Sequence, residues 1–213
     1  MSPWRILSLL LDYPEAELLD CTEELAAMTR ELESAAAREA ILAFLAHRAG
    51  QTASEAQREY VETFDFAKRA TLYLSFHAYG DRRQRGMAML HLKTAYREEG
   101  FALGDGALPD YLPAILEFAG EMPEAGVAVL GDFRPALEVV RAALRAEESA
   151  YAGLLDALCG LLPAVSGKDL EEARRIAAEG PPSESVGLEP FGPPEAMPPA
   201  CAPVAPGAGK VAQ

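Results

Sequence analysis

Helix start and stop signals recur along the first 180 residues, and they restrict the fold more than any other feature of this sequence. Ser2-Pro3 is typical of an N-cap followed by proline at the first helical position, and Thr52-x-x-Glu55 has the form of a capping box. Asp81-x-x-Gln84 predicts a related cap for a long helix that ends at Gly100. No alternating strand pattern of useful length is present. We therefore expect an all-α, single-domain bundle of roughly nine or ten helices joined by short loops.

One of these helices is predicted between Leu18 and Leu32, where apolar residues keep helical spacing without a proline or glycine. The composition changes at Gly180, because nine of the 16 prolines fall between Pro181 and Gln213. Such a segment buries too little apolar surface to offset the entropy cost of ordering it. We expect a helical domain over residues 1–179 and a disordered Pro/Ala/Gly-rich tail over residues 180–213.

The charge of the chain excludes several classes of partner. Lys and Arg number 19 and Asp and Glu number 33, which gives a net charge of −14. Such a chain repels nucleic acid and anionic membrane surfaces and attracts basic partners. The apolar stretch before Asp12 is too short for a signal peptide, and no run has membrane-spanning length. Three scattered cysteines suit a reducing compartment, so we expect a cytoplasmic protein that is not an integral membrane protein.

Motifs of catalysis are missing from the sequence. There is no nucleophile elbow, phosphate-binding glycine loop, zinc-protease helix or paired C-x-x-C. His47, His77 and His91 are scattered and suggest no metal site. We therefore expect a protein that is not an enzyme and that acts by binding.

A local inversion of charge stands out between residues 68 and 97, which contain seven basic residues and one acidic residue. Arg82, Arg83 and Arg85 are its centre. They either pair with neighbouring acidic helices or contact an anionic group outside the chain. That group would be an acidic partner surface or a phosphate-bearing cofactor.

The segment Leu108-Pro109-Asp110-Tyr111-Leu112-Pro113 predicts a helix start. Pro113 is compatible with a helix only in the first turn, which makes Asp110 the expected N-cap. At 100° per residue, Glu117 then shares a face with Asp110 and lies opposite the apolar residues. This acidic face either presents carboxylates to a basic peptide or is an ordinary solvated surface.

Several short motifs occur in a fixed order over the middle of the chain. They are Tyr60-Val61-Glu62-Thr63-Phe64-Asp65-Phe66, Leu72-Tyr73-Leu74, Tyr79-Gly80-Asp81, Arg85-Gly86-Met87-Ala88 and Leu108-Pro109-Asp110-Tyr111-Leu112-Pro113. Together they resemble the nitrate reductase delta subunit family of TorD-like maturation chaperones. The opening Asp12-Tyr13-Pro14 fits the same family.

The resemblance implies an assembly chaperone for a respiratory nitrate reductase. Such chaperones bind the N-terminal segment of the catalytic (alpha) subunit and assist insertion of molybdenum cofactor, as molybdopterin guanine dinucleotide, before the enzyme associates with the membrane. The resemblance implies no stably bound cofactor, but it allows contact with cofactor-insertion machinery. In the wider group a histidine often follows the Pro-Asp step, whereas this chain has Tyr111.

Apolar and acidic residues in and near the matched motifs are the candidates for a peptide-binding groove. Tyr60 and Tyr73 are favoured among them, because a phenol offers both apolar contact and a hydrogen bond. For most of the aromatic residues the alternative is an ordinary place in the core. The candidates are Tyr60, Phe64, Phe66, Leu72, Tyr73, Phe76, Asp110, Tyr111 and Glu117.

Two other functions remain open at this point. The chain could serve another molybdoenzyme, such as one of the dimethyl-sulfoxide-reductase type, or it could be a helical adaptor that stays in the mature complex. The identity of the bound peptide distinguishes the first alternative, and co-purification with active enzyme distinguishes the second.

Overall fold

The computed structural model describes residues 1–66, 69–80, 83–104 and 106–180. The prediction of an all-helical fold is confirmed, since twelve α-helices account for the regular structure of these residues. The predicted tail, apart from Gly180, lies outside the described residues. The helices are α1 (Pro3–Leu11), α2 (Ala16–Asp20), α3 (Thr22–Arg30), α4 (Ala35–Ala49), α5 (Ala53–Phe64), α6 (Leu74–Tyr79), α7 (Arg83–Glu98), α8 (Leu112–Glu121), α9 (Pro123–Asp132), α10 (Arg134–Ala146), α11 (Ala152–Leu161) and α12 (Gly167–Glu179).

The predicted count of nine or ten helices is too low for two physical reasons. The helix expected between Leu18 and Leu32 is interrupted at Cys21, where the backbone turns and the apolar spacing nevertheless continues. Pro123 and Pro135 each lie in the first turn of a new helix, where a missing N–H costs nothing. Residues 112–146 therefore form three helices with almost no loop between them.

The predicted caps at Ser2 and Thr52 are confirmed. The Ser2 hydroxyl accepts a hydrogen bond from the Arg5 N–H, and Thr52 and Glu55 form both bonds of a capping box. The predicted cap at Asp81 lies outside the described residues.

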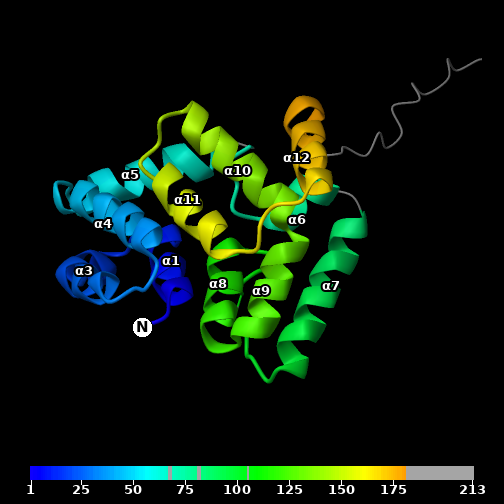
Figure 1. Ribbon diagram of the computed structural model, residues 1–213, viewed down its shortest axis with the longest axis horizontal. Helices are drawn as coiled ribbons and strands as arrows, with labels where there is room; N and C mark the ends of the chain where they lie inside the picture. The colour runs from blue at the N-terminus through cyan, green and yellow to red at the C-terminus, as the bar shows by residue number, and fades with distance from the viewer. Residues whose placement is uncertain (67–68, 81–82, 105, 181–213) are drawn as a thin grey trace, which may run out of the picture.

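The main core lies where α1, α4, α8 and α11 meet (Figure 1). The apolar side of α1, including Ile6, Leu7 and Leu11, is fully buried against α8 and α11. A smaller aromatic cluster joins α7 to α8, with the Tyr96 and Phe118 ring centroids 4.7 Å apart and Phe101 beside both. None of the described helices is long and apolar enough to cross a membrane.

Two short extended segments pair in the middle of this bundle. Leu74 N–H donates to the Asp110 carbonyl and Leu112 N–H donates to the Leu72 carbonyl, both at 2.9 Å. Tyr73 and Tyr111 are the bridged residues. The chain between them contains α6 and α7, and the pairing holds the two ends of this stretch side by side.

The prediction that Asp110 caps α8 is wrong. Tyr111 is the N-cap residue and makes no side-chain capping bond, while the Asp110 carboxylate is fully buried. Pro113 is the second helical residue and has no N–H for a cap to bind. Asp110 is therefore free to turn inward, away from the solvated side of α8 that carries the exposed Glu117.

Gly126 of α9 is required by the close packing of α9 against α8. A Cβ atom at Gly126 would lie 2.2 Å from the Ala119 Cα and 2.7 Å from the Ala119 N. We expect Gly126→Ala to lower the free energy of unfolding by about 1–3 kcal/mol, because the two backbones must separate. Urea denaturation measures the change.

Gly131→Ala is the matched control in the same helix, since nothing lies within 4 Å of its added methyl group. Alanine has the higher helix propensity, so this variant should be neutral or gain up to about 1 kcal/mol. Equal losses in the two variants would contradict the close contact with Ala119.

Tyr151 provides a test of the core at high pH. Its ring is fully buried, its hydroxyl accepts a hydrogen bond from the Arg48 guanidinium, and burial raises its pKa to about 12. The folded state therefore holds the phenol proton more tightly than the unfolded state. Stability is fully present below the ordinary tyrosine pKa of about 10 and falls as the pH rises toward 12.

We expect Tyr151→Phe to lose about 1–2 kcal/mol at pH 7, because Arg48 loses a buried partner. Above pH 10 the variant should lose stability less steeply than the parent, by up to about 1.4 kcal/mol per pH unit. Urea denaturation between pH 7 and 11.5 measures both effects, with the exposed Tyr79→Phe as the control. Parallel curves for Tyr151→Phe and the parent would contradict the assignment.

Candidate functional site

Four tyrosines and one aspartate lie close together. Two of the five residues come from the link between α1 and α2, one from α5, and two from the positions just before α6 and α8. We call Tyr13, Tyr60, Tyr73, Tyr111 and Asp12 the tyrosine patch. Tyr73 stacks on Tyr111 with ring centroids 5.2 Å apart, and Tyr13 meets Tyr60 edge-on at 5.6 Å. Tyr13 and Tyr73 are 42% and 37% exposed, so the patch reaches the surface.

A chain of hydrogen bonds runs through the patch from the core to solvent. The Tyr111 hydroxyl donates to Asp12 Oδ1 at 2.9 Å and lies 2.7 Å from the Tyr60 hydroxyl. Because Tyr111 has already used its proton, Tyr60 is the donor of that second bond. The Tyr60 hydroxyl also donates to the Leu11 carbonyl at 3.3 Å, so its one proton is shared between that carbonyl and Tyr111. With Tyr111 donating to Asp12, donation runs from Tyr60 through Tyr111 to Asp12.

The phenols of Tyr60, Tyr73 and Tyr111 remain protonated at neutral pH. Burial raises the pKa of Tyr60 and of Tyr111 far above the ordinary value. Burial also raises the pKa of Tyr73, and the negative charges of Asp110, Asp65 and Asp12 raise it further. The patch therefore combines neutral hydrogen-bonding rings with nearby carboxylates, a surface that suits an apolar segment with positive charge.

Asp110 and Arg85 meet beneath this surface. Arg85 Nη2 lies 3.3 Å from Asp110 Oδ2, and the Ser75 hydroxyl donates to the same carboxylate oxygen. Arg85 Nε also donates to the Ser75 hydroxyl, and the guanidinium lies over the Phe76 ring. This cluster ties α6 and α7 to the segment that precedes α8.

The structure places the remaining predicted residues in three settings. Phe64 and Leu72 are buried in the core, whereas Phe66 is 78% exposed just beyond the end of α5. Glu117 is exposed on the flank of α8 that also carries Glu121, which pairs with Arg5 at 3.3 Å. Arg83 is exposed at the start of α7, and Arg82 lies outside the described residues. The structure thus brings Tyr60, Tyr73 and Tyr111 together.

Asp12 and Tyr13 are members of the patch that the list of candidate residues lacks. Their signal was the Asp12-Tyr13-Pro14 motif, which matched the family but carried no contact information. Pro14 ends the run of α1, and the Asp12 carboxylate accepts from the Tyr13 N–H at 2.8 Å. That local bond turns the chain so that both side chains face Tyr60 and Tyr111.

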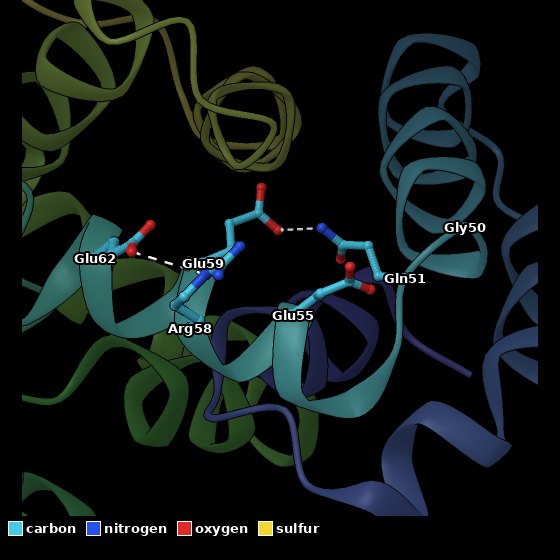
Figure 2. Close-up of a pocket in the computed structure, with 6 residues that line it drawn as sticks. All are labelled: Gly50, Gln51, Glu55, Arg58, Glu59 and Glu62. Carbon is cyan, nitrogen blue, oxygen red and sulfur yellow. Dashed lines mark hydrogen bonds and ion pairs between the residues drawn. The ribbon is translucent and has the colours of Figure 1, made fainter.

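A separate hollow of about 330 Å³ lies beside α5, lined by Gly50, Gln51, Glu55, Arg58, Glu59 and Glu62 (Figure 2). Its carboxylates are already engaged. Glu55 accepts from the Thr52 N–H, which lowers its pKa. Glu59 accepts from Gln51 at 2.9 Å and Glu62 pairs with Arg58 at 3.8 Å, as the dashed lines in Figure 2 show. We therefore place the candidate site at the tyrosine patch.

Among the described residues, no group of three or more His, Cys, Asp or Glu side chains could hold a metal ion. Cys159 is buried in the core, which raises the pKa of its thiol to about 11. His77 is also buried, which lowers its pKa, and it bonds the Thr71 carbonyl at 2.9 Å. Both groups serve packing where they lie.

Comparison with known proteins finds relatives that are named as nitrate reductase assembly chaperones. It is 33% identical over 167 residues to the probable nitrate reductase molybdenum cofactor assembly chaperone NarJ of Bacillus subtilis (strain 168), covering 78% of this chain and 91% of that protein. It is 35% identical over 178 residues to NarJ of Escherichia coli (strain K12), which bears the same description without "probable". That match covers 82% of this chain and 75% of the relative.

A third relative contains a similar region within a longer protein. The nitrate reductase-like protein NarX of Mycobacterium tuberculosis (strain ATCC 25618 / H37Rv) is 36% identical over 165 residues, which cover 73% of this chain and 24% of that protein. Residues 20–157 also match the sequence model of a family described as the nitrate reductase delta subunit. Since this match spans more than half of the chain, the chain belongs to the nitrate reductase delta subunit family.

Proposed function

We propose that this chain is an assembly chaperone for a respiratory nitrate reductase and that it binds the N-terminal segment of the catalytic subunit at the tyrosine patch. Two of its relatives are named as molybdenum cofactor assembly chaperones of nitrate reductase, and neither name describes an enzyme. The observation that carries the proposal is the exposed pair Tyr13 and Tyr73, set on a hydrogen-bonded base of Tyr60, Tyr111 and Asp12.

The chemistry of the patch supports a basic, apolar peptide as its ligand. The rings of Tyr73 and Tyr13 offer flat apolar contact, and Phe66 adds an exposed ring beyond α5. The charges of Asp110, Asp65 and Asp12 act to raise the pKa of the Tyr73 phenol while Arg85 acts to lower it, so the nearby carboxylates favour a positive side chain over Tyr73. The net charge of −14 speeds the encounter with a basic segment.

Binding at this patch would hold back the catalytic subunit and would not change it chemically. In the proposed sequence the chaperone works in the cytoplasm, holds the catalytic subunit while molybdopterin guanine dinucleotide is inserted, and releases it before membrane association. The chain itself binds no cofactor stably in this proposal. Contact of Arg82, Arg83 and Arg85 with an anionic group of the client or of the insertion machinery also belongs to the proposal. Arg85 would have to make that contact while it holds Asp110.

The first test is calorimetric titration of the full chain with a peptide from the N-terminus of the cognate catalytic subunit, about 15 residues or four helical turns long. We expect Tyr73→Ala to raise Kd about tenfold, which corresponds to about 1.4 kcal/mol, because the stacked ring is lost. Tyr79→Ala is the matched control, since Tyr79 is 36% exposed and lies at the other end of α6.

Equal effects of these two substitutions would refute binding at the patch. Tight binding of a dimethyl-sulfoxide-reductase-type peptide in place of the nitrate reductase peptide would assign a different client. Co-purification of the chain in fixed stoichiometry with active nitrate reductase would instead indicate an adaptor subunit.

A second test addresses the charge of the patch. Asp12→Asn keeps an oxygen that accepts from Tyr111 but removes the negative charge. We expect Kd for the basic peptide to rise about two- to fivefold at low salt, and the difference to shrink at about 0.5 M NaCl. Asp20→Asn, exposed at the end of α2, should leave Kd unchanged. A salt-insensitive effect of Asp12→Asn would contradict an electrostatic role.

A further inference from the structure

The outer side of α7 carries an exposed surface that the tyrosine patch does not use. Met87 and Leu90 are both 53% exposed, the largest exposure of any aliphatic side chain in the described helices. Lys93 and Arg97 follow on the same side, within about 120° of the helix circumference. We call Met87, Leu90, Lys93 and Arg97 the α7 face. In Figure 1, α7 lies at the edge of the molecule beside α9.

This helix is held by few buried side chains. Only Leu92 and Tyr96 of α7 are buried, and Tyr96 anchors it by donating from its hydroxyl to the Pro109 carbonyl at 2.7 Å. A helix fixed by one row of contacts leaves most of its circumference to solvent. Apolar residues on that open side are not needed for folding, which points to a role in association.

The charge of the α7 face is opposite to that of the chain. Lys93 and Arg97 are exposed and form no ion pair with any residue that the structure describes. The Arg97 guanidinium donates only to the neighbouring Thr94 hydroxyl, at 3.2 Å. These two cations therefore remain available to carboxylates from outside, on a protein whose net charge is −14.

A hollow of about 350 Å³ lies between α7 and α9, round the helix from the α7 face. It is lined from α7 by Ala88, His91, Leu92 and Ala95, and no residue of the α7 face lines it. Exposed apolar residues and cations thus occur together on one side of α7, apart from that hollow.

We infer that the α7 face is a second docking surface, for a partner protein that presents an acidic amphipathic helix. Leucine-like residues of that helix would cover Met87 and Leu90, while its carboxylates would meet Lys93 and Arg97. The proposed basic peptide of the catalytic subunit is repelled by this face. Two ligands of opposite charge would therefore be directed to two surfaces of one chain.

Two other occupants fit the surface less well. An anionic membrane attracts Lys93 and Arg97 but is repelled by the rest of a chain of charge −14. A second copy related by a two-fold axis would bring the same cations together and repel itself. An acidic amphipathic helix satisfies both the charge and the apolar residues of this face.

The test is a pair of synthetic helical peptides of about five turns, titrated into the full chain by fluorescence anisotropy. Both have leucine along one side; one has glutamate on the flanks and the other has lysine in the same positions. We expect the glutamate peptide to bind saturably. Leu90→Ser and the pair Lys93→Gln with Arg97→Gln should each raise its Kd at least tenfold. These are exposed positions, and circular dichroism checks that the variants keep their helix content.

The same variants should leave binding of the basic peptide from the catalytic subunit unchanged, which separates this inference from the proposed function. The inference is overturned if neither synthetic peptide binds or if both bind alike. It also fails if Tyr73→Ala weakens the glutamate peptide as much as Leu90→Ser does. Binding of phosphatidylglycerol vesicles that depends on Lys93 and Arg97 would assign the face to a membrane. A dimer that Leu90→Ser dissociates would assign it to a second copy.

Discussion

Two backbone hydrogen bonds pair the segment at Leu72 to Leu74 with the segment at Asp110 to Leu112. Everything proposed for this protein depends on that pairing. It sets Tyr73 against Tyr111, and it buries Asp110 where Ser75 and Arg85 reach it. It also holds together the two ends of the chain segment that contains α6 and α7, whose Tyr96 packs against Phe118 of α8.

The part of the fold that the sequence predicts rests on local chemistry. Ser2 and Thr52 act as the caps that their positions indicated, because a cap depends on residues three or four apart. The break at Cys21 carries no such local signal, since apolar spacing survives a tight turn. Local reasoning also misplaced Asp110, because the segment that pairs with it is far away in the sequence. The apolar candidates Phe64 and Leu72 show the same limit, since spacing does not separate a groove from a core.

The two proposed surfaces divide the electrostatics of the molecule. The tyrosine patch gathers neutral phenols beside carboxylates, whereas the α7 face places cations beside apolar side chains. The two paired backbone segments separate these surfaces, and the ion pair of Asp110 and Arg85 lies at one of the segments. A strongly acidic protein can in this way keep a single basic helix without neutralising it.

The hydrogen bonds at position 111 define which side chains that position accepts. Tyr111 accepts a hydrogen bond from Tyr60 and donates one to Asp12. A neutral histidine also has one acceptor and one donor on its ring, so the histidine that is common at this step in the wider group satisfies the same demand. Protonation below a pKa of about 6.5 removes its acceptor. A patch built on histidine would therefore change its bonding in mildly acidic solution, whereas the tyrosine in this chain keeps the same proton arrangement throughout the physiological range.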